Sequence, residues 1–362
     1  MLLDIETASP PFKVTQKIAA SELKNRMTGS AAAGRLIDMA AAHSGIDQRF
    51  IVIPDAETSN GDKFYSNNGK YVSPDTEKRM VEYEKWSKNL AGSAVEKLFH
   101  ETGFSSRDIN KIITISCTGF YAPGLDHYLI NEFSLPLQIK RTNIGFMGCA
   151  ASLIGFGSVL EVMKSEENKN VLLVSTEICS LHLQTEPTRD NILANMIFAD
   201  GAAAALFSNS PEYTRGGKLQ LIKTDSILFE NSSGFMGWKI GNFGFEMILS
   251  SELPRIILNE AVPALKGILQ KQGIDAAAVK HWALHPGGRA ILDSLQKGLD
   301  LSDDQMEASR AVLRSYGNLS SASILFVLKE LLRSGDIHKD ELCCAVAFGP
   351  GLTMEVALLK GR

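Results

Sequence analysis

One uncharged stretch limits what this chain can fold into more than any other feature. It runs from Ile144 to Leu160 and reads IGFMGCAASLIGFGSVL, without an acidic or basic residue. Its length borders on that of a membrane span, but glycines interrupt it repeatedly. We therefore predict a strand end, a tight turn at Gly148, and a buried helix that carries Cys149 in its first turn.

This predicted position of Cys149 has two interpretations. The positive end of a helix dipole favours a thiolate, so a cysteine in the first turn of a helix can act as a nucleophile. Free cysteine is also among the most buried residue types, and most buried cysteines only fill space. Both interpretations stay open on this stretch alone.

The composition excludes several classes of function. The chain has 362 residues, of which 22% are charged, and a net charge of −4. It therefore lacks the basic footprint of a nucleic-acid-binding protein. The five cysteines form no CxxC pair and no cluster with histidine at zinc spacing, so we expect no metal site and a reducing, cytoplasmic compartment. We also expect neither a signal peptide nor a membrane span.

The order of predicted elements indicates an α/β protein with an internal duplication. Strands and helices alternate in the first part of the chain and end in two strands, and the same order returns after the polar, turn-rich segment 208–218. We predict two similar βαβαβ-type halves, 1–210 and 211–362, each with a mixed sheet flanked by helices. No sequence repeat is visible, so this duplication rests on element order alone.

Three polar residues follow glycine-punctuated strand ends, where α/β proteins gather their reactive groups. They are Cys149 in GFMGCAA, His285 in LHPGG and Asn318 in YGNLSSA. Taken singly, each has a structural interpretation as well as a functional one. His285 can be a core histidine, and Asn318 can be a helix cap. Taken together, a thiol, an imidazole and an amide form a set that can attack a carbonyl and stabilise the resulting oxyanion.

Longer motifs around these residues resemble those of the type III polyketide synthases, the chalcone synthase-like branch of the thiolase-fold condensing enzymes. The motifs are GCAAS, FADGAAAALF, ALHPGGRAILD, VLRSYGNLSSASILFVL and AFGPGLTMEVALL. The resemblance covers nearly the whole chain. It implies a thiolase-like fold with layers in the order α-β-α-β-α. The YGNLSSA and FGPGLT runs argue against the related ketoacyl carrier-protein synthases III.

The resemblance implies an acyltransferase that needs coenzyme A thioesters as substrates and no other cofactor. Cys149 would be acylated by a starter acyl-CoA and hold the growing chain. His285 and Asn318 would bind the thioester carbonyl of malonyl-CoA, promote loss of CO2 and stabilise the enolate, which attacks the Cys149 thioester. His285 would also keep Cys149 as a thiolate. We therefore expect iodoacetamide to inactivate the protein well below about pH 8.5, where an ordinary thiol ionises.

The same resemblance implies the residues that bind substrate. Phe198 and Phe245 match aromatic gatekeepers between the coenzyme A tunnel and the cavity, and Glu177 and Ser320 match residues that hold a water in some members. Further matches to cavity positions are Cys117, Cys179, His182, Ala122 and Pro350. Plant enzymes insert a methionine into the partner's cavity at the position of Ala122, so the smaller residue should leave more room, enough for a long fatty acyl starter. The expected coenzyme A contacts are Arg35, Gly287, Gly288, Arg289 and Ala290, with Arg49 as a second candidate for the diphosphate near the first helices.

The resemblance further implies a homodimer and a pyrone or a resorcinol- or phloroglucinol-type product. Two alternatives remain within the fold: a condensing enzyme whose substrate arrives on a carrier protein, and a non-catalytic partner subunit. A partner subunit typically lacks the cysteine, which is present here. A papain-like hydrolase would also have the order Cys, His, Asn, but it would carry its cysteine near the mature N-terminus.

Overall fold

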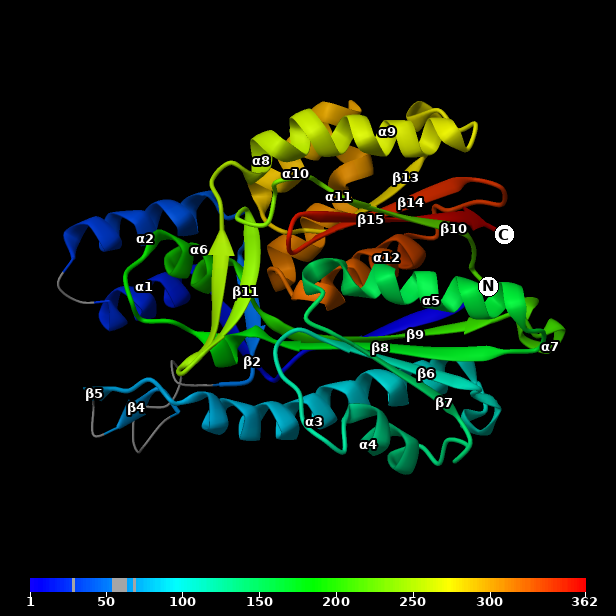
Figure 1. The fold of residues 1–362 in the computed structure, drawn as a ribbon, viewed down its shortest axis with the longest axis horizontal. Helices are drawn as coiled ribbons and strands as arrows, with labels where there is room; N and C mark the ends of the chain where they lie inside the picture. Colours follow the sequence, from blue (N-terminus) through cyan, green and yellow to red (C-terminus); the bar gives the residue numbers. More distant parts are fainter. Residues whose placement is uncertain (28–29, 54–63, 68–69) are drawn as a thin grey trace.

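The computed structural model describes residues 1–27, 30–53, 64–67 and 70–362, and its centre is a mixed sheet (Figure 1). In the described residues this sheet has nine strands in the order β13-β14-β15-β10-β1-β9-β8-β6-β7. Their bounds are β1 Leu2–Ala8, β6 Lys111–Ser116, β7 Lys140–Gly145, β8 Asn170–Ile178, β9 Asp200–Ser208, β10 Leu219–Leu228, β13 His281–Leu284, β14 Leu342–Gly349 and β15 Thr353–Gly361.

The sheet divides into two parts with the same pattern of pairing. In the first, β6 and β8 are parallel, while β8, β9 and β1 are antiparallel. In the second, β13 and β14 are parallel, while β14, β15 and β10 are antiparallel. The two parts meet where Leu2 of β1 pairs with Leu219 of β10. The predicted α/β class and the two similar halves are confirmed, whereas the boundary at residue 210 stays a prediction.

Helices lie between and outside the two parts of the sheet, which gives the five layers of the expected fold (Figure 1). Three apolar cores separate these layers: one around the central helices and one under each outer helical layer. The central helices are α5 Ala151–Ser165 and α12 Ser323–Ser334; the outer ones are α3 Thr76–Thr102 and α4 Leu125–Glu132 on one side and α8 Leu253–Ile256, α9 Val262–Lys271, α10 Arg289–Leu299 and α11 Asp303–Tyr316 on the other.

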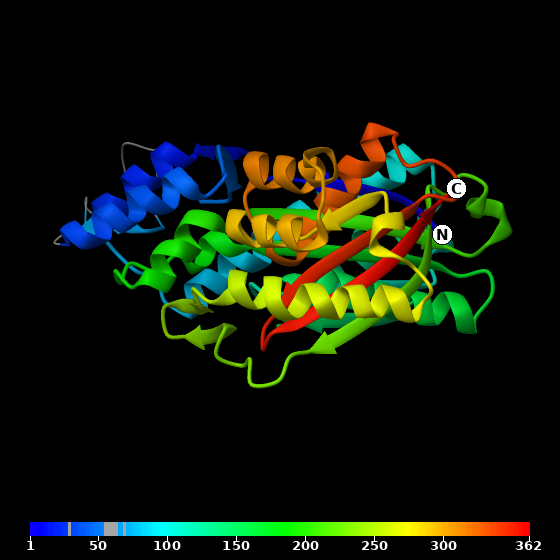
Figure 2. The ribbon, with the colours of Figure 1, turned by 90° about the horizontal axis from the view of Figure 1, so that it is seen from above.

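A smaller group of elements closes one end of the layers. Seen from above, α1 and α2 project beyond the other helices at that end (Figure 2). The group comprises helices α1 Gln16–Arg26, α2 Ala31–His43 and α6 Arg189–Ile197, the paired strands β2 Phe12–Thr15 and β3 Gln48–Ile51, and the hairpin of β11 Met236–Gly241 and β12 Gly244–Leu249. The short strands β4 Ser66–Asn67 and β5 Lys70–Tyr71 and the helix α7 Pro211–Thr214 complete the described strands and α-helices.

Two similar turns begin the two central helices. A 3-10 turn over Gly148–Ala150 precedes α5, and a 3-10 turn over Ser320–Ala322 precedes α12. Both turns start with a left-handed residue, with φ of 63° at Gly148 and 50° at Ser320. A Cβ on Gly148 would lie 2.3 Å from Cδ of Pro350, so both the turn and the close approach require glycine. Cys149 therefore sits at the beginning of the buried helix, as predicted.

The uncharged stretch that borders on a membrane span in length is divided among β7, the turn at Gly148 and α5. Among the described residues, no helix is both long enough and apolar enough to cross a membrane.

Candidate active site

The Cys149 thiol faces two polar side chains from the start of the second turn and the segment just before it. Its Sγ lies 4.0 Å from Oδ1 of Asn318 and 3.8 Å from Oγ of Ser320. The Asn318 amide is held on both sides, since Oδ1 accepts the Ser320 backbone N–H at 2.8 Å and Nδ2 approaches the Gly287 carbonyl at 3.4 Å. The structure thus brings the predicted nucleophile and amide together.

His285 follows β13 directly, in the segment that Asn318 contacts through Gly287. The imidazole is 2% exposed, and neither of its ring nitrogens has a hydrogen-bond partner among the described residues. A buried imidazole with two free nitrogens is costly unless a ligand group completes it. His285 therefore has the properties of a ligand-binding group, whereas a core histidine would have its hydrogen bonds satisfied.

Burial shifts the pKa of both Cys149 and His285 towards their neutral forms. It raises the pKa of the Cys149 thiol to about 12, against smaller opposing contributions from Ser320 and Asn318. It lowers the pKa of His285 to about 3. Both shifts run opposite to the expectation of a resting thiolate beside an imidazolium, because no hydrogen bond joins the thiol to His285 and the low-dielectric surroundings favour the neutral forms.

Glu177 lies fully buried near the end of β8. Its carboxylate accepts the Cys117 backbone N–H at 3.0 Å and the Thr118 hydroxyl at 2.8 Å. The hydroxyl of Ser321 also donates to it. Burial raises the pKa of Glu177, and these neutral donors oppose the shift. The resemblance pairs Glu177 with Ser320, but in the structure Ser321 makes the contact and Ser320 faces the thiol.

An aromatic group covers the site opposite Cys149. His182 stacks on Phe245, with ring centroids 4.1 Å apart, and both rings meet Trp238 edge-on. His182 accepts the Phe245 backbone N–H at 3.0 Å on Nδ1 and therefore carries its hydrogen on Nε2, which donates to the Thr118 carbonyl at 2.7 Å. Burial lowers the pKa of His182 to about 3.

His182 lies at the wall of a cavity, as the resemblance implies. Because both of its ring nitrogens are engaged with the backbone, it also fixes the β12 strand to the loop that follows β6.

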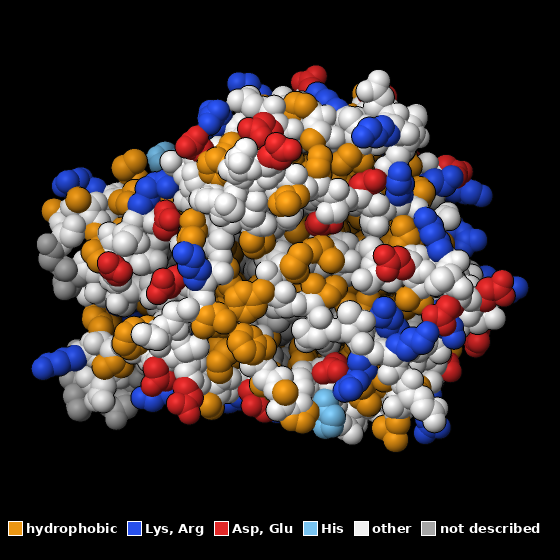
Figure 3. Space-filling model, in the orientation of Figure 1, with side chains coloured by type: hydrophobic (Ala, Val, Ile, Leu, Met, Phe, Trp, Pro, Cys, Tyr) orange, Lys and Arg blue, Asp and Glu red, His pale blue; other side chains and the backbone are white. Residues whose placement is uncertain are grey.

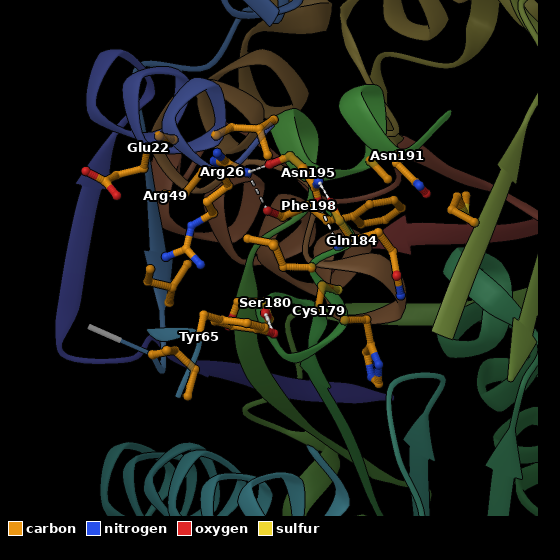
Figure 4. A pocket seen from close by; sticks show the side chains of 18 of the residues that line it. Glu22, Arg26, Arg49, Tyr65, Cys179, Ser180, Gln184, Asn191, Asn195 and Phe198 are labelled. Atoms are coloured by element: carbon orange, nitrogen blue, oxygen red, sulfur yellow. Dashed lines mark hydrogen bonds between the residues drawn. The ribbon is translucent and has the colours of Figure 1, made fainter. Parts of the chain in front are cut away.

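The backbone of the predicted gatekeeper Phe198 is tied to Asn318 and to a buried arginine. Phe198 and Asn318 form a parallel bridge. Nη1 of Arg49 donates to the carbonyls of Asn195 and Phe198, each at 2.7 Å (Figure 4). Burial lowers the pKa of Arg49 to about 10, and the nearby Asp200 carboxylate opposes this shift.

Two cavities meet at the aromatic group. The cavity at Cys149, which Cys117 and Pro350 also line, has a volume of about 30 Å³. The second cavity has about 120 Å³ and lies among α1, β3, α6 and the turn after β8 (Figure 4). The wall common to both consists of Cys179, Phe198, Trp238 and Met247.

The expected coenzyme A contacts are only partly brought together. Arg289 begins α10 after Gly287 and Gly288, and it lines a surface pocket of about 330 Å³ together with Arg310 and Arg314. Arg35 is exposed on α2 and does not line this pocket. Ala290 is exposed beside Arg289.

Ala122 lies on the surface in a loop near other apolar residues. It precedes a cis peptide bond to Pro123 and does not line either cavity of its own chain. Phe120 and Phe243 nearby in the fold are 59% and 53% exposed. Figure 3 shows hydrophobic side chains gathered on this face, over the β11–β12 hairpin and the loops below it.

Sequence reasoning missed Trp238, Met247 and Ser321, and it assigned Arg49 to the coenzyme A diphosphate and not to the backbone of Phe198. The first two face the site only because β11 and β12 form a hairpin, in which Trp238 is paired with Met247. Ser321 had a usable signal, since the order of elements makes its turn the counterpart of the Cys149 turn. The partners of Arg49 had no signal in the sequence, because they lie far along the chain, with a separation of 149 residues for Phe198. Among the described residues, no group of three or more His, Cys, Asp or Glu side chains could hold a metal ion.

Comparison with known proteins places these features in context. A family model described as "Chalcone and stilbene synthases, C-terminal domain" matches residues 220–362, and one described as "FAE1/Type III polyketide synthase-like protein" matches residues 48–227. A 1,3,6,8-tetrahydroxynaphthalene synthase of Streptomyces coelicolor is 31% identical over 79% of this chain and 75% of its own.

Two further comparisons extend over different parts of the chain. An alpha-pyrone synthesis polyketide synthase-like protein of Mycobacterium tuberculosis is 29% identical over 70% of this chain and 65% of its own. The crystal structure of PKS-I from the brown alga Ectocarpus siliculosus covers 100% of this chain and 98% of its own, with a TM-score of 0.92 and 28% identity.

Proposed function

The chain belongs to the type III polyketide synthases, and from this premise we propose that Cys149, His285 and Asn318 are its catalytic residues. The enzyme is an acyltransferase that condenses malonyl-CoA onto an acyl-CoA starter with loss of CO2. The observation that carries the assignment is the Cys149 thiol 4.0 Å from the Asn318 amide oxygen. The same amide contacts Gly287, close in sequence to the His285 imidazole, whose two ring nitrogens have no partner among the described residues.

Loading begins with attack of the Cys149 sulfur on the thioester carbonyl of the starter. The thiol proton passes to His285, a new C–S bond forms, and coenzyme A leaves as a thiolate that takes up the proton. Burial shifts the pKa of the thiol up and that of the imidazole down, which favours transfer of the proton during the attack over a proton already resting on His285. The buried start of α5 supports the reaction by placing the positive end of the helix beside the sulfur.

Extension requires a carbanion equivalent, which decarboxylation supplies. When the carbon–carbon bond to the malonyl carboxylate breaks, its electron pair moves into the thioester carbonyl and forms an enolate. Donors from Asn318 Nδ2 and His285 stabilise the oxygen of this enolate, an effect worth about 3–4 kcal/mol for one well-placed donor. The enolate carbon then attacks the acyl group on Cys149, and the Cys149 thiolate departs as the leaving group.

The ring type of the product is also part of the proposal. Two relatives have names that refer to a tetrahydroxynaphthalene and to an alpha-pyrone. We propose a pyrone or a resorcinol- or phloroglucinol-type product from an apolar starter. The apolar walls of both cavities support an apolar starter. No metal or further cofactor enters these steps.

We propose that coenzyme A enters beside α10 and that the enzyme is a homodimer. Arg289, with Arg310 and Arg314, lines a surface pocket next to the glycines that lead to His285, and such a pocket suits a diphosphate. The exposed Phe120 and Phe243 support a second copy of the chain on that apolar face.

Incubation with radiolabelled malonyl-CoA and acyl-CoA starters from acetyl to stearoyl tests the proposed function, with Cys149→Ala in parallel. We expect extended, cyclised products from the wild type and none from Cys149→Ala, which should still release CO2. A carrier-bound substrate would give CO2 without extended product in the wild type. A folded protein that neither releases CO2 nor acylates Cys149 would contradict the assignment.

A further inference from the structure

We infer that Asp200 is a positioning residue for decarboxylation, because its buried carboxylate fixes the Phe198–Asn318 pair relative to the rest of the site. This inference rests on the proposed function, in which the Asn318 amide stabilises the enolate. Asp200 is fully buried at the first position of β9, two residues after Phe198. The N–H of Ala199, which lies between them, donates to the Asn318 carbonyl at 2.9 Å. The position of β9 at this point therefore sets the position of Asn318.

The carboxylate of Asp200 joins β9 to two other segments of the chain. Its Oδ1 accepts the backbone N–H of Ser180 at 2.7 Å, and its Oδ2 accepts the backbone N–H of Val52 at 2.8 Å. The hydroxyl of Ser180 also donates to Oδ2. Ser180 belongs to the turn after β8, and Val52 directly follows β3, so one side chain holds both segments against β9.

The segment at β3 is also bound to Phe198, which closes a ring of contacts. Nη1 of Arg49 in β3 donates to the Phe198 carbonyl at 2.7 Å, and the N–H of Val52 beyond β3 returns to Asp200. Arg49, Phe198 and Ser180 all line the second cavity (Figure 4). The backbone at Phe198 is thus held directly by Arg49 and, two residues later, by the carboxylate of Asp200.

This arrangement suits the ionised form of Asp200. Burial raises the pKa of Asp200 to about 6, against opposing contributions from Ser180, Val52 and Arg49. The carboxyl group is therefore ionised at neutral pH and gains a proton as the pH falls through about 6. A protonated oxygen is itself a donor and competes with the N–H groups that face it. Protonation should therefore loosen the contacts that Asp200 makes with both neighbouring segments.

Other titratable groups on the elements around Asp200 keep their charge near pH 6. They are Arg49 on β3, with a pKa of about 10, His182 on the turn after β8, with a pKa of about 3, Cys179 on the same turn and Tyr83 on α3, whose pKa values burial raises, and the guanidinium of Arg79 on α3. Glu177 on β8 points to the opposite face of the sheet, since it pairs with the residue after Asp200.

The test compares release of CO2 from malonyl-CoA with acylation of Cys149 by a starter acyl-CoA. Asp200→Asn keeps the shape of the side chain but turns an NH2 group toward a backbone N–H. We expect it to lower the rate of CO2 release at least roughly tenfold, since a misplacement of about 1 Å can cost on the order of 10²-fold. Acylation of Cys149 does not use the Asn318 donor, so its rate should stay within a factor of about three.

The pH dependence gives a readout that a merely structural role would not change. Wild-type CO2 release should fall as the pH drops through about 6 and approach the rate of Asp200→Asn at lower pH. The Asp200→Asn variant should lack this acid limb, because asparagine does not titrate. Glu177→Gln should keep the limb, which separates Asp200 from the other buried carboxyl group near the site.

Two further variants serve as comparisons. Asp4 is a buried acid on the neighbouring strand β1, bound to Lys218 at 2.6 Å, and it lines neither cavity. Asp4→Asn should therefore change neither the ratio of the two rates nor the acid limb. Ser180→Ala loses the hydroxyl donor and keeps the backbone N–H, so it should lower CO2 release by a smaller factor than Asp200→Asn. Thermal unfolding reports the fold of each variant.

Hydrogen–deuterium exchange tests the same positioning without substrate. The amides of Ala199 and Asn318 should exchange roughly tenfold faster or more in Asp200→Asn and at the wild-type rate in Asp4→Asn. A wild type that neither releases CO2 nor acylates Cys149 would reject the proposed function, and the exchange rates would still decide the inference.

Three outcomes would overturn the inference. The first is an equal loss of CO2 release and of Cys149 acylation in Asp200→Asn, and the second is an acid limb that persists in this variant. The third is unchanged exchange of the Ala199 and Asn318 amides. If Asp200→Asn does not fold, the rates and the exchange of Ser180→Ala decide by the same criteria.

Discussion

Phe198 and Asn318 pair through their backbones as adjacent parallel strands do, although they come from opposite halves of the chain. The Asn318 N–H donates to the Ile197 carbonyl at 2.8 Å, and the Ala199 N–H donates to the Asn318 carbonyl at 2.9 Å. The gatekeeper position and the amide that faces Cys149 therefore move as one unit. Any residue that holds the Phe198 backbone also positions Asn318.

Arg49 is that residue, and its removal should be costly. In Arg49→Met, the carbonyls of Asn195 and Phe198 lose their donor and buried Asp200 loses its nearby cation. We expect the free energy of unfolding to fall by roughly 2–4 kcal/mol. Arg35→Met, which changes an exposed arginine on α2, should stay within about 0.5 kcal/mol of the wild type. Urea unfolding of the three proteins measures both differences, and equal losses would contradict this role of Arg49.

The reactivity of Cys149 should rise with pH without an early plateau. Only the thiolate reacts with iodoacetamide, and burial raises the pKa of this thiol from its usual 9.0 to about 12. A higher pKa means less thiolate at any given pH, so the rate of alkylation should still be increasing above pH 9.0.

The measurement is the rate of inactivation by iodoacetamide from neutral to alkaline pH, without substrate. A plateau well below the usual thiol pKa would instead indicate the thiolate–imidazolium pair expected from the family resemblance. Cys149→Ala identifies the labelled site by mass.

Replacing Glu177 with glutamine should change how stability depends on pH. Burial raises the folded pKa of Glu177 above its usual 4.5, so the stability that its protonated form provides is complete below that value and is lost as pH rises through the folded pKa. Glutamine cannot ionise, and the hydroxyls of Thr118 and Ser321 can turn to suit it. The Glu177→Gln variant should therefore gain stability relative to the wild type as pH rises. Urea unfolding at acidic and neutral pH tests this, and a constant difference would contradict it.

Asn318→Asp should lower the rate of decarboxylation while it leaves the stability of the fold nearly unchanged. Aspartate keeps an oxygen for the Ser320 backbone N–H but loses the Nδ2 donor. Release of CO2 from malonyl-CoA should fall roughly 10²–10³-fold, the usual loss for one donor to an oxyanion. Thermal unfolding should remain close to that of the wild type. A rate within a factor of about two would show that Asn318 does not stabilise the enolate.

A charge on the apolar face should disrupt the proposed dimer. Phe120 is 59% exposed in the single chain, and an acidic side chain there would be buried without a partner in a dimer. Phe120→Glu should sediment as a monomer at concentrations where the wild type sediments as a dimer. Leu137→Glu is the matched control, since Leu137 is 89% exposed outside that loop. A monomeric wild type would reject the dimer directly.

The sequence was most informative where glycine punctuates the chain. The turn at Gly148 could be predicted because glycine permits the left-handed backbone there, and the segment after β13 could be predicted from Pro286 and its following glycines. Residues such as Trp238 and Arg49 could not, because their partners depend on how a hairpin and a helix pack against remote loops. His182 shows the same limit, since the sequence could place it at a cavity wall but could not predict that remote backbone groups engage both ring nitrogens.

The duplicated turns at Cys149 and Ser321 have a consequence for how the enzyme gains activity. The nucleophile belongs to one copy of the repeated unit, and His285 and Asn318 belong to the other. Neither copy is a smaller enzyme on its own, because each contains only part of the reacting set. During refolding, the return of condensation activity would thus report the moment at which the two copies assemble, later than the formation of helices and strands within either one.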